Sequence, residues 1–135
     1  MTAFYLDTSY LLALELKRDQ NHRSAQAHWK KLEKSSPRLV TTSYVFDEFV
    51  TFLSARGHRE RAIQAGNFLL QSPSTQVMQV DEPLFWKGWQ SFQKHADKSY
   101  SLTDCISFAA MDELGIQTAL TFDQHFESFG FSKEP

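Results

Sequence analysis

The chain has 135 residues, of which 41% are hydrophobic and 12 are phenylalanine. A chain of this length and composition folds with a packed core, which excludes an intrinsically disordered protein. The formal net charge of −2 provides no basic footprint for a nucleic acid. If four of the 16 acidic residues gathered in one pocket, however, the 14 lysines and arginines would outnumber the rest. We therefore expect a single domain over residues 1–135, and charge alone does not identify its partners.

Cysteine content and hydropathy narrow the class further. Cys105 is the only cysteine, which excludes a disulfide framework and a thiolate zinc cluster. It lies in an apolar helical pattern, so we interpret it as a small core residue rather than a nucleophile. The first residues lack the basic and apolar regions of a leader peptide, and no apolar run approaches the length of about 18 residues that spans a membrane. We expect a cytoplasmic protein without a membrane segment.

The first predicted strand, Ala3–Leu6, ends at an acidic residue, Asp7. A helical pattern with apolar residues at Leu11, Leu12, Leu14 and Leu16 follows. Asp7 stands where a helix N-cap is expected, so its carboxylate has two interpretations, a cap or a functional group. The residue taken alone does not decide between them.

The next predicted elements are an amphipathic helix over residues 22–32, a strand over residues 39–42, and a helix from Tyr44 to Arg56 with Ser43 as its N-cap. The third element carries two adjacent acids, Asp47 and Glu48. On a helical wheel Glu48 lies at the edge of the apolar face, whereas Asp47 points toward solvent. The wheel favours Glu48 as the inward carboxylate, and a solvated acidic side is the alternative for both.

A turn with several basic residues, Arg56–Arg61, precedes another helix. It is either a phosphate contact or an ordinary solvated turn. A third strand is predicted over residues 75–80, and Pro83 then opens a helix in its first turn. Aromatic residues at Phe85, Trp89 and Phe92 form a stripe on that helix, which we interpret as core or subunit interface rather than a base-stacking platform.

The stretch from Ser99 to Phe126 combines a buried helix with a strand. Asp104 lies at the start of the helix, and Ser101-Leu-Thr-Asp104 also fits a capping box, so capping alone is an alternative role for Asp104. Gly115 suits the helix C-cap, and residues 117–122 read as a strand that delivers Asp123 at its end. The aromatic tail that follows should dock a last segment onto the sheet.

Helices alternate with the predicted strands, which requires a mostly parallel sheet with right-handed connections. Asp7 and Asp123 then leave strand C-termini on the same edge of the sheet, and the helices that begin at Ser43 and Ser101 start near that edge, so Glu48 and Asp104 can reach it. A carboxylate cluster without thiols favours a hard octahedral cation, Mg²⁺ or Mn²⁺. The chemistry expected of such a site is attack by metal-bound water on a phosphodiester.

Four short motifs carry a family resemblance. In chain order they are L-D-T-S at Leu6–Ser9, T-S-x-x-x-x-E at Thr42–Glu48, S-x-T-D-C-x-S-F at Ser101–Phe108 and T-F-D-x-H-F at Thr121–Phe126. In their order and spacing they resemble the PIN-domain nucleases, and among these the bacterial VapC-type toxin ribonucleases. The resemblance covers essentially the whole chain.

This resemblance implies a three-layer α/β/α PIN-like fold and a Mg²⁺- or Mn²⁺-dependent endoribonuclease. It places the metal-binding and catalytic site at four acids, Asp7, Glu48, Asp104 and Asp123. It implies that Ser9, Thr103 and Thr121 are polar neighbours that orient the carboxylates or water, and that His125 is a neighbour rather than a ligand. It also implies a structured RNA substrate such as tRNA or rRNA, a cognate antitoxin protein and a homodimer.

Two other functions fit part of the same pattern. One is a PIN-like binding module or scaffold without catalytic activity. The other is a phosphate-ester hydrolase of the haloacid-dehalogenase type, which also places an aspartate at the end of a strand. Such hydrolases carry D-x-D at that turn, whereas this sequence has Ser9 at the third position.

Overall fold

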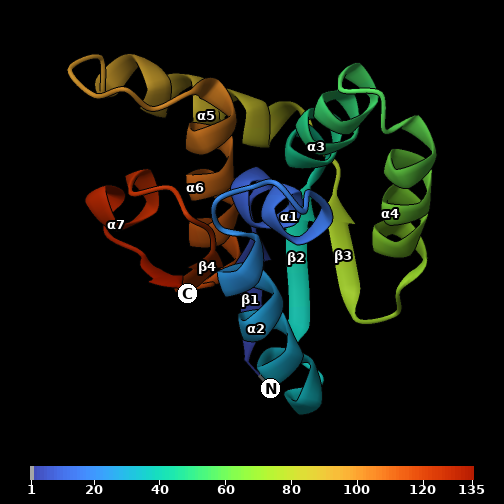
Figure 1. The fold of residues 1–135 in the computed structure, drawn as a ribbon. Helices are drawn as coiled ribbons and strands as arrows, with labels where there is room; N and C mark the ends of the chain where they lie inside the picture. The colour runs from blue at the N-terminus through green and yellow to red at the C-terminus, as the bar shows by residue number, and fades with distance from the viewer. Residues whose placement is uncertain (1) are drawn as a thin grey trace.

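The computed structural model describes residues 2–135, and within them a five-stranded sheet is flanked by helices (Figure 1). The strands are β1 (Ala3–Leu6), β2 (Arg38–Thr42), β3 (Thr75–Met78), β4 (Thr118–Leu120) and β5 (Ser132–Glu134). The helices are α1 (Thr8–Glu15), α2 (His22–Leu32), α3 (Ser43–Ala55), α4 (Arg59–Gln71), α5 (Glu82–Lys94), α6 (Leu102–Leu114) and α7 (His125–Phe129), with a short 3-10 turn η1 at Glu33–Ser35.

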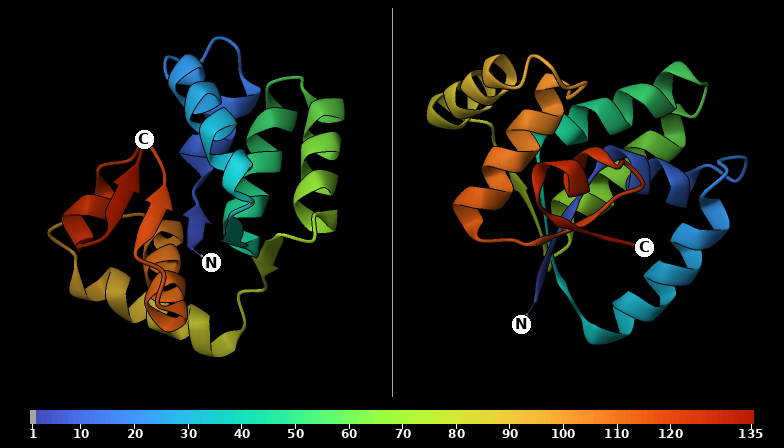
Figure 2. Two further views of the ribbon diagram at one scale, coloured as in Figure 1. Left: turned by 90° about the horizontal axis from the view of Figure 1, so that it is seen from below. Right: turned by 90° about the vertical axis from the view of Figure 1, so that its left-hand side faces the viewer.

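All the strand pairs of the sheet are parallel, and the strand order is β3-β2-β1-β4-β5. Helices α1 to α4 cover one face of the sheet, and α5 to α7 cover the other (Figure 2). This is the arrangement that right-handed connections require, because the chain moves in one direction from β1 to β3 and in the other from β3 to β5. The expected three-layer α/β/α fold is confirmed.

Helix α6 is mostly buried from Asp104 to Met111, as its sequence predicts, but its last turn is exposed and includes Leu114, which is 44% exposed. It packs against α5 on one side and approaches β2 and α3 on the others. Ile106, Phe108 and Met111 are at most 1% exposed. The helix ends at Gly115, whose φ of +68° lies in the left-handed region that glycine adopts without strain.

The start of α3 differs from the prediction by one residue. The N-cap is Thr42, whose Oγ1 accepts a hydrogen bond from the Val45 amide at 3.3 Å. Ser43 is instead the first helical residue, and its Oγ accepts from the Val80 amide at 3.0 Å. Both hydroxyls satisfy backbone donors, and sequence alone does not say which donor each one takes.

The aromatic stripe on α5 is only partly core. Phe85 packs against the core, but Phe92 is 37% exposed and stacks on half-buried Trp89 with ring centroids 5.6 Å apart. The fully buried positions of α5 are Leu84 and Gly88. The predicted role of the stripe as a subunit interface remains a prediction.

The chain after β4 docks onto the sheet, as expected, and it also adds a fifth strand that the sequence pattern did not reveal. Phe126 is fully buried, and β5 pairs with β4 in parallel. A second attachment runs through His28 of α2. Its Nδ1 lies 2.8 Å from the Tyr10 hydroxyl and its Nε2 lies 2.7 Å from Glu134 Oε1. The last strand is therefore bonded to both β4 and α2.

Within residues 2–135, each helix is too short or too polar to cross a membrane.

A close approach between α5 and α6 gives a test of the packing. A methyl group at Gly88 would overlap the Ile106 side chain and lie 3.1 Å from the Ile106 Cα, so the two helices would have to move apart. We expect Gly88→Ala to lower the free energy of unfolding by about 1–3 kcal/mol, the usual range for overpacking. Urea denaturation measures this.

Gly66→Ala in α4 is the matched control, because both glycines are helical and both substitutions gain helix propensity. A methyl group at Gly66 meets only the edge of the Phe46 ring at 3.2 Å and the Val50 side chain at 3.4 Å. We expect its effect to be small. Equal stability of the two variants would contradict the close α5–α6 contact.

Candidate active site

Asp7 lies at the junction of β1 and α1, and its carboxylate does not cap the helix. The residue has extended backbone angles, and no side-chain cap hydrogen bond forms. Its Oδ2 instead accepts hydrogen bonds from Ser9 Oγ at 2.9 Å and from Thr121 Oγ1 at 2.7 Å. The capping interpretation of this carboxylate is therefore wrong, because the side chain turns away from the helix toward the end of β4.

The two hydroxyls also fix the loop that follows β4. Ser9 Oγ accepts from the Phe122 amide at 3.0 Å, and Thr121 Oγ1 accepts from the Asp123 amide at 2.9 Å. A hydroxyl has one hydrogen to donate, and both donate it to Asp7. Ser9 and Thr121 thus orient Asp7 and at the same time hold the backbone of Asp123, which is the kind of role the family resemblance implies.

Asp104 caps its helix and also faces the site. The predicted capping box forms, with the Ser101 amide donating to Asp104 Oδ2 at 3.1 Å and the Asp104 amide donating to Ser101 Oγ at 3.0 Å. The same Oδ2 receives a hydrogen bond from His125 Nδ1 at 2.9 Å. Asp104 is 8% exposed as a whole residue. Among residues 2–135 its Oδ1 has no hydrogen-bond partner. Capping and a place in the site are thus compatible roles.

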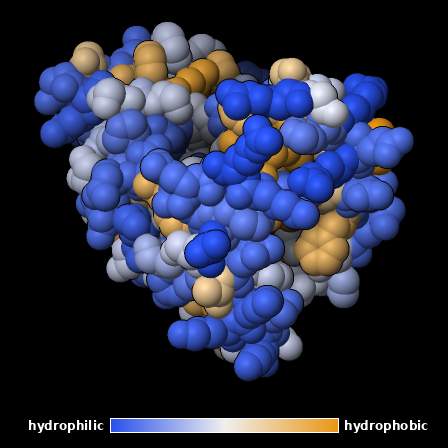
Figure 3. All heavy atoms as spheres, in the orientation of Figure 1, coloured by the Kyte–Doolittle hydropathy of each residue, from blue (hydrophilic) through white to orange (hydrophobic). Residues whose placement is uncertain are grey.

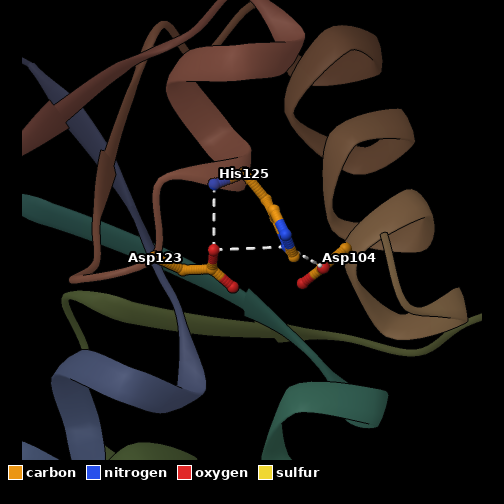
Figure 4. A group of neighbouring side chains, drawn as sticks. All are labelled: Asp104, Asp123 and His125. Carbon is orange, nitrogen blue, oxygen red and sulfur yellow. Dashed lines mark hydrogen bonds and ion pairs between the residues drawn. The ribbon is translucent and has the colours of Figure 1, made fainter. Parts of the chain in front are cut away.

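Asp123 lies in the turn between β4 and α7, His125 is the first residue of α7, and both meet Asp104 (Figure 4). The His125 amide donates to Asp123 Oδ1 at 2.9 Å, which closes a tight turn, and His125 Nδ1 lies 3.2 Å from the same oxygen. Ligand atoms of Asp104, Asp123 and His125 all lie within 4.8 Å of one another. Because ionised carboxylates only accept hydrogen bonds, the ring nitrogen between the two carboxylates carries the hydrogen.

His125 contacts two of the four predicted acids directly and forms with them a group that could hold a metal ion. That it is a neighbour of the metal rather than a ligand remains a prediction. Its Nε2 is also 3.0 Å from Ser99 Oγ. The signal for it is the D-x-H spacing, which places the histidine amide over the aspartate oxygen.

Glu48 lies apart from this group, but it is hydrogen-bonded to Thr8, which follows Asp7 at the carboxyl edge of the sheet. It is exposed, and its Oε1 accepts from Thr8 Oγ1 at 2.9 Å, beside Asp7 in the sequence. Asp47 instead accepts from Thr51 Oγ1 of its own helix at 3.2 Å. Both acids are exposed, so burial does not confirm that Glu48 points inward; Glu48 contacts α1, whereas Asp47 contacts its own helix. A catalytic role for Glu48 remains a prediction.

Thr103 lacks the contact that the resemblance implies. It is half-buried on α6, and within the described chain its hydroxyl makes no hydrogen bond to a site carboxylate.

Burial dominates the electrostatics of Asp7. The pKa of Asp7 is raised to about 6, and desolvation by burial is the largest cause; the hydrogen bonds from Thr121 and Ser9 oppose the rise, and the charges of Asp104 and Asp123 add to it. The three aspartates are thus close enough for their charges to interact. Ionising all of them costs free energy, which a divalent cation among them would offset.

The donor set fits a hard cation. Carboxylate oxygens are the ligands that Mg²⁺ and Mn²⁺ prefer. The one thiol of the described chain, Cys105, is fully buried on α6, and burial raises its pKa. It therefore packs as a neutral side chain, as expected.

Comparison with known proteins identifies the family. A model of the PIN domain matches residues 4–132. The chain therefore belongs to the PIN domain family. This assignment does not support the haloacid-dehalogenase alternative, and the hydrogen bond from Ser9 to Asp7 shows that a hydroxyl stands where such hydrolases carry a second aspartate.

The most similar proteins in these comparisons are VapC toxins. The chain is 34% identical over 128 residues to the 23S rRNA-specific endonuclease VapC20 of Mycobacterium tuberculosis. The alignment covers 94% of each protein. The crystal structure of M. tuberculosis VapC20, described as a Sarcin-Ricin loop cleaving toxin, superposes with a TM-score of 0.83 at 32% identity, over 95% of each chain. VapBC2 from Rickettsia felis, bound to a DNA fragment of its promoter, shares the fold with a TM-score of 0.71 at 12% identity, over 98% of each chain. The resemblance to VapC-type toxins is confirmed.

The raised pKa of Asp7 predicts a pH-dependent instability of the metal-free protein. The pKa rises from 3.8 to about 6, so the folded state binds this proton more tightly than the unfolded state does. Stability is therefore lost as the pH rises between these values, by up to about 3 kcal/mol. In EDTA at pH 7.5, we expect Asp7→Asn to unfold at a higher urea concentration than the wild type, with the difference disappearing near pH 4.

Added Mg²⁺ or Mn²⁺ should stabilise the wild type more than Asp7→Asn. The control is Asp47→Asn, which removes an exposed acid of α3 and should match the wild type at each pH. A difference between wild type and Asp7→Asn that does not change between pH 4 and pH 6 would contradict the effect of burial.

Proposed function

We propose that this protein is a metal-dependent endoribonuclease, the toxin of a toxin–antitoxin pair. The observation that carries the proposal is the convergence of Asp7, Asp104 and Asp123 at the carboxyl edge of the parallel sheet, in a chain that belongs to the PIN domain family. The 34% identity to an rRNA-specific endonuclease over nearly the whole chain supports the same activity.

We assign the metal-binding and catalytic site to Asp7, Glu48, Asp104 and Asp123, with Mg²⁺ or Mn²⁺ as the cation. A bound ion of this kind lowers the pKa of a coordinated water and neutralises the negative charge that develops on the phosphate. The carboxylates would hold the cation, and the hydrogen bonds from Ser9 and Thr121 fix the orientation of Asp7 for this role. His125 bridges Asp104 and Asp123, so we assign it to positioning these two carboxylates.

Structured ribosomal RNA is the substrate class to test first. VapC20 is described as 23S rRNA-specific and as cleaving the Sarcin-Ricin loop, and it covers nearly the whole chain at more than 30% identity. We propose that this protein acts in the cytoplasm on an rRNA loop of the same kind, and that a cognate antitoxin controls it. A homodimer, implied by the family, is part of the proposal and is tested by measuring the mass in solution.

Cleavage of RNA by the purified protein tests the activity. We expect discrete fragments of total cellular RNA with Mg²⁺ or Mn²⁺ and none in EDTA. Asp104→Asn should lower the cleavage rate about 100-fold or more, because it removes a charge that holds the cation. Glu48→Gln should also lower it, whereas Asp47→Asn, on the adjacent residue of the same helix, should cleave like the wild type.

Full cleavage by Asp104→Asn would overturn the assignment. An intact, inhibitor-free wild type that leaves RNA uncut with either metal would favour the scaffold interpretation instead. A mass measurement on the same sample excludes a co-purified antitoxin as the cause.

A further inference from the structure

A hollow of about 610 Å³ lies between α1, the loop after it, and the turn from α3 to α4. Its floor contains Leu12 and Phe52, and its rim is mostly basic. The basic side chains of the rim are Lys17, Arg18, Arg56, His58 and Arg61. In Figure 3, apolar atoms lie between strongly hydrophilic side chains in the region that α1 and α3 occupy in Figure 1. We call this feature the basic hollow.

The basic hollow lies along the same pair of helices as the acidic site. α1 and α3 both begin at the carboxyl edge of the sheet, and Thr8 bonds Glu48 near that edge. One helical turn further along both helices, Leu12 and Phe52 form part of the floor of the hollow. Arg56 lies eight residues beyond Glu48, which corresponds to about 12 Å along a helix.

Two cations of the rim, Arg56 and Arg61, are held in place by contacts that do not neutralise them. The Arg56 guanidinium lies over the Phe52 ring at 4.2 Å from its centroid, and Arg61 donates to the carbonyl oxygen of Glu15 at 2.6 Å. Over residues 2–135, Lys17, Arg18, Arg56 and Arg61 make no ion pair with an acid. The one acid of the rim, Asp19, accepts from the Asn21 amide at 2.8 Å. The hollow thus keeps a positive excess.

An acidic site presents an electrostatic problem for a polyanionic substrate. The chain has a net charge of −2, and the aspartates surround the place where the scissile phosphate has to bind. Part of the affinity for RNA must therefore come from cations elsewhere that contact the neighbouring phosphates. The basic hollow supplies such cations on the helices that lead away from the site.

We propose that the basic hollow binds backbone phosphates of the RNA next to the cleaved bond. This inference rests on the proposed endoribonuclease function and adds the path of the substrate, from the acidic site along α1 and α3 to the α3–α4 turn. The sequence allowed two interpretations of the basic turn at residues 56–61, a phosphate contact or an ordinary solvated turn. The proposal assigns this turn to a phosphate contact.

Binding of an RNA hairpin with the Sarcin-Ricin loop sequence tests this, measured in EDTA so that cleavage does not interfere. Arg18→Gln/Arg56→Gln removes two charges from the rim. The matched control, Lys34→Gln/Arg38→Gln, removes one lysine and one arginine that are exposed at η1 and at the start of β2, near the opposite edge of the sheet. A second hollow variant, Lys17→Gln/Arg18→Gln, changes only the exposed loop after α1. It shows whether weaker binding by the first variant results from the lost charges or from misfolding caused by the substitution of Arg56.

We expect both hollow variants to bind on the order of tenfold more weakly than the wild type at about 0.1 M salt, with a plot of log K against log salt that is shallower by about 1.5. The control should bind within about twofold of the wild type. Equal affinity and equal salt dependence of hollow variants and control would overturn the inference.

Two other outcomes separate this inference from the proposed function. If the wild-type protein cleaves RNA and the hollow variants bind and cleave RNA as well as the wild type, only the inference about the basic hollow is refuted. If the wild-type protein never cleaves RNA, but the hollow variants bind RNA more weakly than the wild type and the control does not, the nuclease function is refuted and the phosphate-binding role of the hollow is retained. If the hollow variants lose only the binding of a poly-glutamate peptide, the hollow belongs to an acidic protein partner and the inference fails.

Discussion

Burial of the Asp7 carboxylate is the constraint on which the site depends. A charged group that is 6% exposed is costly unless donors surround it, and two hydroxyls from segments 112 residues apart meet this need. The same hydroxyls hold the backbone after β4, so orienting Asp7 and placing Asp123 are one structural event. The site is therefore assembled by hydrogen bonds across the β1–β4 pair.

The parallel sheet explains why these segments meet. β1 pairs with both β2 and β4, so its end lies at the centre of the carboxyl edge, where open parallel sheets form their sites. α6 adds Asp104 from the opposite face to that of α1 and α3, because the connection from β3 returns across the sheet. The role of each carboxylate is ambiguous in the sequence when the residue is taken alone. The strand order explains why these carboxylates lie close together in the folded chain.

The sequence pattern predicts the parallel pairing and the edge at which the acids gather, because both follow from helices that alternate with strands, whereas the three layers are implied by the family resemblance. It does not predict β5, whose three residues Ser132–Glu134 show no apolar alternation and are placed by pairing alone. Nor does it predict that Asp104 serves as cap and site residue together, or that His125 joins two carboxylates. The capping box and the D-x-H turn are local, but the pairing of β5 with β4 and the bond from His125 to Asp104 join segments farther apart, and local patterns carry no record of such contacts.

The attachment of the last strand has a consequence for the cooperativity of the site. Asp123 and His125 lie in the segment between β4 and β5, and β5 is held both by β4 and by Glu134, which bonds the His28–Tyr10 pair. That segment is thus clamped at both ends. Detachment of β5 would loosen the C-terminal end of this segment, while Ser9 and Thr121 still held its start beside Asp7. The rim of the sheet thus supports the acidic cluster from outside, through a contact with no part in the chemistry.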